Sequence, residues 1–136
     1  MNALIVEDNA YEADLIETIL RGDGYTVTQT GMLADAVRTL KARAFDLVTL
    51  DLKLHDSGRE STIERMPEII ALAQGAPVLV VTGFPSAITD EVRGIVAGVL
   101  YKPYHSQDFL NATRIAVRST EIRQLKKKDV WAMTNH

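Results

Sequence analysis

Hydrophobic residues along the chain alternate between two spacings. Short, largely apolar runs predict five strands, at residues 4–6, 25–29, 45–50, 78–81 and 99–100. Between them, apolar residues recur three and four positions apart and predict helices at residues 10–22, 33–44, 60–73 and 86–96, with a last helix from residue 106. Because strand and helix alternate regularly, the pattern predicts right-handed crossovers and an α/β fold, with a mostly parallel sheet between two layers of helices.

The two ends of the predicted helical series carry further signals. Asn9 followed by Glu12 predicts an N-cap with a capping box at the start of the first helix. The last helix is predicted to run on toward residues 126–128, and we interpret Trp131 and Met133 beyond it as a tail that packs on the domain. We therefore expect one domain at residues 1–120, followed by a helical extension and tail at residues 121–136.

Length, charge and composition limit the classes of protein that fit. The 136 residues, 46% of them hydrophobic, suffice for one core. A formal charge of −3 provides no basic field for nucleic acid, and the longest uncharged stretch, residues 69–89, is interrupted by glycine and proline. The chain has no cysteine, and its first apolar run is too short for a signal peptide. We therefore expect a cytoplasmic protein without nucleic-acid or membrane partners.

Polar residues follow four of the five predicted strands. In chain order they are Glu7 and Asp8, Asp51, Thr82 and Lys102. In an open parallel sheet, functional groups gather beyond the carboxyl ends of the strands. Three carboxylates in one small mouth repel each other unless a cation neutralises them, and oxygen ligands suit Mg²⁺ or Mn²⁺. The hydroxyl of Thr82 and the ammonium of Lys102 complete a predicted site for a phosphoryl group.

The order and spacing of these residues are similar to those of the receiver domain of two-component response regulators. The resemblance covers residues 3–118. It rests on the acidic pair after the first strand, the aspartate after the third, the threonine after the fourth and Lys102-Pro103 after the fifth. It implies a flavodoxin-like, doubly wound sheet of five parallel strands in the order 2-1-3-4-5. Because fewer than twenty residues follow the core of the final helix, we expect a stand-alone receiver without an output domain.

The resemblance implies a role for each residue at the site. Asp51 would be the phosphoacceptor. Asp8 would bind the metal directly and Glu7 would bind it through water. Thr82 would hydrogen-bond the phosphoryl group and shift on activation, while Lys102 would pair with that group.

Three further roles follow from the same resemblance. The backbone carbonyl of Lys53 would be a metal ligand. The peptide bond before Pro103 would be cis. Lys53 and Phe84, two residues beyond the phosphoacceptor and the threonine, would tune the lifetime of the aspartyl phosphate, and we hypothesise that Phe84 screens the phosphoryl group from water.

The loop after the third strand departs from the family pattern. Receivers usually carry a proline four residues after the phosphoacceptor and a glycine eight residues after it. Here those positions hold His55 and Arg59, and Gly58 stands one place early. The geometry of this loop is therefore expected to be unusual.

The switch position also departs from the pattern. Receivers usually place an aromatic residue three positions before the lysine, where its rotamer couples to the threonine. That position is Val99 here, and Tyr101 and Tyr104 are displaced aromatics. The usual coupling would have to use a different group, or would not operate.

These observations predict a signalling protein and leave two alternatives open. As a receiver, the chain would take a phosphoryl group from a histidine kinase or a histidine phosphotransfer protein, catalyse only its own phosphorylation and dephosphorylation, and signal by protein contact. Its fourth helix, fifth strand and fifth helix would form a face for partners or for a homodimer. The altered loop and missing aromatic favour a pseudo-receiver that binds without phosphorylation. An aspartate-dependent phosphatase is disfavoured, because Lys53 stands where that class needs a second aspartate.

Overall fold

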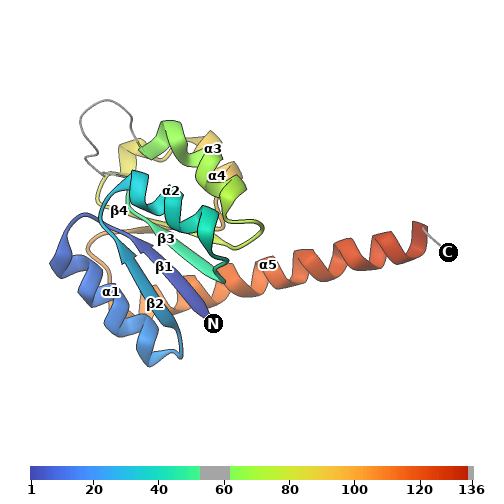
Figure 1. The fold of residues 1–136 in the computed structure, drawn as a ribbon, viewed down its shortest axis with the longest axis horizontal. Helices are drawn as coiled ribbons and strands as arrows, with labels where there is room; N and C mark the ends of the chain where they lie inside the picture. The colour runs from blue at the N-terminus through green and yellow to red at the C-terminus, as the bar shows by residue number, and fades with distance from the viewer. Residues whose placement is uncertain (53–61, 135–136) are drawn as a thin grey trace.

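Five parallel strands form one sheet in the centre of the molecule (Figure 1). The computed structural model describes residues 1–52 and 62–134. The strands are β1 (Asn2–Val6), β2 (Thr26–Thr30), β3 (Leu47–Leu50), β4 (Val78–Thr82) and β5 (Gly98–Tyr101). Their order is β2-β1-β3-β4-β5, and every neighbouring pair is parallel. The predicted fold class and strand order are therefore confirmed.

Helices cover both faces of this sheet. They are α1 (Ala10–Gly22), α2 (Leu33–Ala42), α3 (Thr62–Leu72), α4 (Asp90–Ile95) and α5 (Ser106–Thr134), with a short 3₁₀ helix, η1, at Pro85–Ala87. One core cluster joins the sheet to α2, α3 and α4, and a second joins it to α1 and α5. Successive strand residues point to opposite faces, so Leu4 and Val6 belong to the first cluster while Ala3 and Ile5 belong to the second.

The fourth helical segment is shorter than the sequence predicts. The predicted helix at residues 86–96 is divided into η1 and α4. Thr89 lies between them and caps α4, because its Oγ1 accepts a hydrogen bond from the backbone N–H of Val92 at 3.2 Å. A threonine that bonds the backbone in this way favours a helix start over a helix interior, which explains the division.

The last helix is longer than predicted and projects from the domain (Figure 1). It continues to Thr134, so Trp131 and Met133 lie on the helix itself, with 68% and 81% of their surface exposed. The interpretation of these two residues as a tail packed on the domain was wrong. Within the described residues, no helix combines the length and hydrophobicity needed to cross a bilayer.

Candidate functional site

Three carboxylates meet at the carboxyl ends of β1 and β3. The backbone N–H of Asp51 donates to the carbonyl of Val6 at 3.0 Å, which places Asp51 beside Glu7 and Asp8. One carboxylate oxygen from each of these three residues lies within 4.8 Å of the other two. Glu7 and Asp51 are buried, while Asp8 is exposed. The predicted acidic cluster is thus assembled by the parallel pairing of β1 with β3.

Burial makes this cluster electrostatically unfavourable without a cation. Burial and the neighbouring Asp51 carboxylate raise the pKa of Glu7 to about 8, although the ammonium of Lys102 acts in the opposite direction. Oxygen ligands at this separation fit a small divalent cation, which commonly takes one or two carboxylates together with water and phosphate oxygens. The donor set therefore fits Mg²⁺, with Glu7, Asp8 and Asp51 as the residues that would hold it.

Lys102 binds this cluster from the end of β5. Its Nζ lies 2.6 Å from Oε1 of Glu7, 2.8 Å from Oε2 of Glu12 and 3.6 Å from Oδ2 of Asp51. Burial by itself lowers the pKa of Lys102, but the hydrogen bonds to Glu12 and Glu7 outweigh burial, so the pKa is raised. Lys102 therefore carries its positive charge in the site.

The backbone around Lys102 is held by β4. Its N–H donates to the carbonyl of Thr82 at 2.8 Å, and the peptide bond to Pro103 is cis, the isomer that the resemblance implies. Thr82 is fully buried at the end of β4, and its Oγ1 accepts a hydrogen bond from the backbone N–H of Phe84 at 3.1 Å. The ends of the two strands thus bring Thr82 and Lys102 to the same edge as the carboxylates.

Glu12 is a site residue, although its place three residues after Asn9 predicts a capping-box role instead. Oδ1 of Asn9 accepts a hydrogen bond from the Glu12 N–H at 3.0 Å, which confirms the N-cap. The predicted capping box was wrong, because the Asn9 N–H donates to Oε2 of Glu7 at 3.3 Å and the Glu12 carboxylate binds Lys102. This hydrogen bond lowers the pKa of Glu12. Glu12 lies in the first turn of α1, near the carboxyl end of β1, and this position in the sequence could have identified it as a site residue.

The displaced aromatic residues lie on different sides of the sheet. Val99 packs against the core cluster below α2, α3 and α4. The hydroxyl of Tyr101 accepts a hydrogen bond from Arg93 of α4 at 2.6 Å, and the Tyr104 ring lies 5.4 Å from that of Phe109 in α5. Tyr101 is thus tied to α4 and Tyr104 to α5.

Several predicted features fall on residues 53–61. Lys53, assigned both as a metal ligand through its carbonyl and as a lifetime-tuning residue, lies outside the described residues. The same holds for the loop departures at His55, Gly58 and Arg59. These assignments remain predictions. Phe84 is described, and its side chain is exposed next to the end of β4.

Comparison with known proteins identifies the family of this chain. The response regulator receiver domain family matches residues 3–114. The transcriptional regulatory protein ZraR of Salmonella typhimurium is 30% identical over 100 residues, which are 74% of this chain and 22% of ZraR. The cell cycle transcriptional regulator CtrA of Caulobacter vibrioides is 27% identical over 124 residues, 89% of this chain and 52% of CtrA. The chain thus spans about a fifth of ZraR and half of CtrA.

A solved structure gives the same result. The N-terminal domain of a response regulator/sensory box/GGDEF three-domain protein from Carboxydothermus hydrogenoformans superposes with a TM-score of 0.77 at 25% identity, covering 90% of this chain and 98% of that one. The match in sequence extends over most of the chain, and the match in structure covers nine tenths of it. The chain belongs to the family of response regulator receiver domains.

Proposed function

We propose that this receiver accepts a phosphoryl group on Asp51 from a phosphohistidine donor, in a reaction that requires Mg²⁺, and signals by protein contact. One observation carries the proposal. The Asp51 carboxylate lies 3.6 Å from the Lys102 ammonium and shares a three-carboxylate cluster with Glu7 and Asp8. Phosphoryl transfer depends mainly on positioning and charge neutralisation, and this cluster provides both.

The residues of the site have separate roles in the transfer. An oxygen of Asp51 forms the new O–P bond while the N–P bond of the donor histidine breaks, and the electron pair of that bond returns to the imidazole nitrogen. Glu7, Asp8 and Asp51 would hold the metal ion, which when bound would supply positive charge to the phosphoryl oxygens. Lys102 supplies a second positive charge, and the hydroxyl of Thr82 can donate a hydrogen bond to the transferred group.

Glu12 is expected to restrain Lys102 before transfer. Because Nζ of Lys102 is bound by both Glu7 and Glu12, the arriving phosphoryl group competes with two carboxylates for the same ammonium. Glu12→Gln removes one competitor and one negative charge near an anionic donor, so we expect acetyl phosphate to phosphorylate this variant about threefold faster than the parent.

The rate can be followed by intact-mass spectrometry in Mg²⁺. Glu17→Gln is the matched control, because Glu17 also lies on α1 but binds Arg21 and Gln29. This control should react at the parental rate. A Glu12→Gln variant that is phosphorylated no faster than Glu17→Gln would contradict the restraint.

An exposed hollow beside Lys102 suits the donor protein. It has a volume of about 540 Å³ and is lined on the α1 side by Tyr11 and Leu15 and beyond β5 by Pro103 and Tyr104. Tyr11 is 80% exposed although it is a large aromatic residue. Exposed aromatic side chains that flank a polar site are typical anchors of protein interfaces. A donor seated there would bring its phosphohistidine next to Lys102 and Asp51.

Tyr11→Ala is therefore expected to slow transfer from a protein donor selectively. With a phosphorylated histidine phosphotransfer protein that phosphorylates the parent, we expect kcat/KM to fall about tenfold, while the rate with acetyl phosphate stays unchanged. Val130→Ala is the control, since Val130 is exposed on α5 far along the chain from the site. Equal losses with both donors would place the effect of Tyr11 in the site itself and contradict a docking role.

Two parts of the earlier expectation remain proposals. Phe84 is placed two residues after Thr82, where its side chain can limit the access of water to an aspartyl phosphate. The face formed by α4, β5 and α5 remains a candidate for partners or for a homodimer, and it carries exposed Ile95 and the contact between Arg93 and Tyr101.

A further inference from the structure

The second half of α5 has little support from the rest of the domain. All three buried residues of this helix, Phe109, Thr113 and Ala116, lie in its first part, and residues 121–131 are exposed throughout. Figure 1 shows this part projecting from the body of the molecule. An isolated helix as short as this second half has only marginal stability in water when no tertiary packing supports it. Packing against a partner surface would therefore stabilise the projecting part of α5.

One side of α5 carries a stripe with alternating spacings of three and four residues. We call it the α5 seam; its residues are Ile115, Arg118, Ile122, Leu125, Asp129 and Ala132. This spacing keeps the stripe on one side of a helix and is typical of helices that pair along their length. Ile115 and Leu125 are 65% and 60% exposed, so apolar surface is available there.

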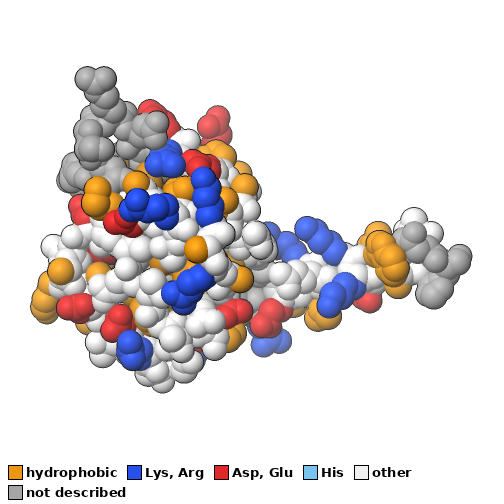
Figure 2. All heavy atoms as spheres, viewed as in Figure 1, with side chains coloured by type: hydrophobic (Ala, Val, Ile, Leu, Met, Phe, Trp, Pro, Cys, Tyr) orange, Lys and Arg blue, Asp and Glu red, His pale blue; other side chains and the backbone are white. Residues whose placement is uncertain are grey.

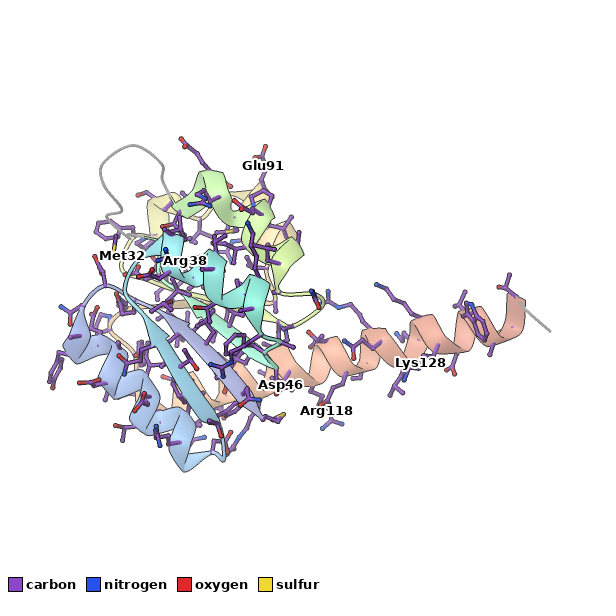
Figure 3. The ribbon with its side chains drawn as sticks, viewed as in Figure 1. Met32, Arg38, Asp46, Glu91, Arg118 and Lys128 are labelled. Atoms are coloured by element: carbon purple, nitrogen blue, oxygen red, sulfur yellow. The ribbon has the colours of Figure 1, made fainter. Side chains whose placement is uncertain are left out.

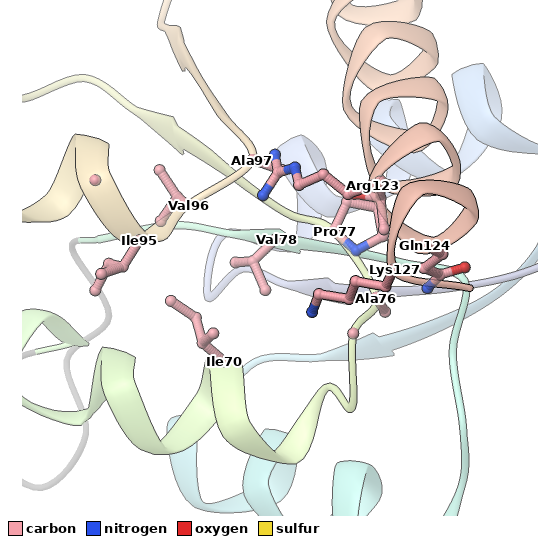
Figure 4. A pocket seen from close by; sticks show the side chains of 13 residues that line it. Ile70, Ala76, Pro77, Val78, Ile95, Val96, Ala97, Arg123, Gln124 and Lys127 are labelled. Atoms are coloured by element: carbon pink, nitrogen blue, oxygen red, sulfur yellow. The ribbon is translucent and has the colours of Figure 1, made fainter. Parts of the chain in front are cut away.

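The seam faces away from the protein's own domain. At about 100° per residue, the seam centres on the side of the helix opposite the buried residues Phe109, Thr113 and Ala116. Figure 4 shows the domain-facing side, where Arg123 and Lys127 extend toward a hollow at Pro77 and Ile70. The domain therefore does not cover the seam.

The two charges in the seam discriminate between the ways in which a second copy could bind. In a parallel pair, equivalent positions face each other, so Arg118 would face Arg118 and Asp129 would face Asp129. In an antiparallel pair with Ile122 opposite Leu125 of the second copy, the same register sets Ile115 opposite Ala132 and Arg118 opposite Asp129. Only the antiparallel arrangement pairs opposite charges.

The positions beside the seam agree with this register. Glu121 comes next to Lys128 of the second copy, and Ser119 comes next to Lys126 of the second copy. Arg118 and Lys128 both extend from α5 into solvent in Figure 3, and Figure 2 shows basic and hydrophobic side chains interspersed along the projecting helix. Charge complementarity therefore continues outside the seam, and like charges are kept apart.

We propose that two copies of this chain pair through antiparallel α5 helices, with residues 115–132 of one seam packed on the same residues of the other. The overlap is about 27 Å long at the rise of an α-helix. Each projecting half is then supported by the first half of the partner helix, which is fixed to its own domain. This contact uses α5 without α4 or β5, and it does not depend on phosphorylation of Asp51.

Sedimentation equilibrium of the full chain over a wide concentration range tests the pairing. We expect the parent to dimerise and Leu125→Asp to be monomeric under the same conditions. Gln124→Asp is the matched control, because the neighbouring Gln124 points to the domain-facing side and should leave the dimer intact. Ile95→Asp, on α4, should also leave it intact. A thermal unfolding midpoint within the parental range for each variant shows that the domain remains folded.

A charge exchange tests the orientation. Arg118→Asp and Asp129→Arg should each weaken the dimer about tenfold, because each places like charges in contact twice by symmetry, and the double variant should restore parental affinity. A parallel pair would not be weakened by either single change. A parent that stays monomeric would overturn the proposal, and this includes a monomer that binds anionic phospholipid vesicles instead. Equal effects of Leu125→Asp and Gln124→Asp on dimerisation would also overturn it. So would a double charge variant whose dimer stays weaker than that of the parent.

Discussion

Asp51→Asn is expected to lose all phosphorylation while remaining folded. With Mg²⁺ and acetyl phosphate, the parent should gain the mass of one phosphoryl group, and the adduct should be stable in acid and labile in base. The amide of asparagine is not a nucleophile for this reaction, so the variant should gain nothing. Its thermal midpoint without metal should equal or exceed that of the parent, because the substitution removes one of two adjacent buried carboxylates.

Two controls make this result specific. Asp46→Asn changes an exposed aspartate that accepts a hydrogen bond from the backbone N–H of Asn2, at the opposite end of the sheet from the site, and should be phosphorylated like the parent. A chelator should prevent the adduct in both proteins. An adduct that persists in Asp51→Asn would refute the assignment of the phosphoacceptor. A parent that gains no adduct would favour the pseudo-receiver, which binds partners without phosphorylation.

Stability without metal is expected to fall as the pH rises from about 5 to 8. The pKa of Glu7 is raised from its ordinary value of 4.5 to about 8 in the folded protein. A raised pKa means that the folded state binds the proton more tightly than the unfolded state. The stabilisation is therefore complete below about pH 4.5 and is lost as the pH rises through about 8. The expected change is a few kcal/mol, a large part of the stability of an ordinary domain.

Urea unfolding in a chelator at a series of pH values measures this change. Glu7→Gln cannot titrate, so its stability should vary much less over the same range. Added Mg²⁺ should stabilise the parent most at pH 8, since the cation replaces the proton that Glu7 releases. A parent whose stability without metal rises toward pH 8, or a variant as pH-dependent as the parent, would show that Glu7 is not the group responsible.

The α/β fold and most of the site are contained in local features of the sequence. Strand and helix periodicities identify the elements, and the constraints on parallel crossovers leave few ways to connect them. Because parallel strands end at the same edge, the residues at or directly after the carboxyl ends of β1, β3, β4 and β5 had to meet there. Glu7, Asp8, Asp51, Thr82 and Lys102 were predicted in this way, and the structure brings all five to that edge.

Other features depend on contacts between residues far apart in the sequence. Glu12 satisfies every local criterion for a capping box, but Lys102, ninety residues later along the chain, is a stronger partner for its carboxylate than a backbone N–H. The orientation of the α5 seam also depends on contacts between residues far apart in the sequence. Its spacing is visible in the sequence, but only the packing of Phe109, Thr113 and Ala116 against the sheet shows that the seam faces outward. Periodicity determines which residues share a side of a helix, whereas tertiary packing determines which side is buried.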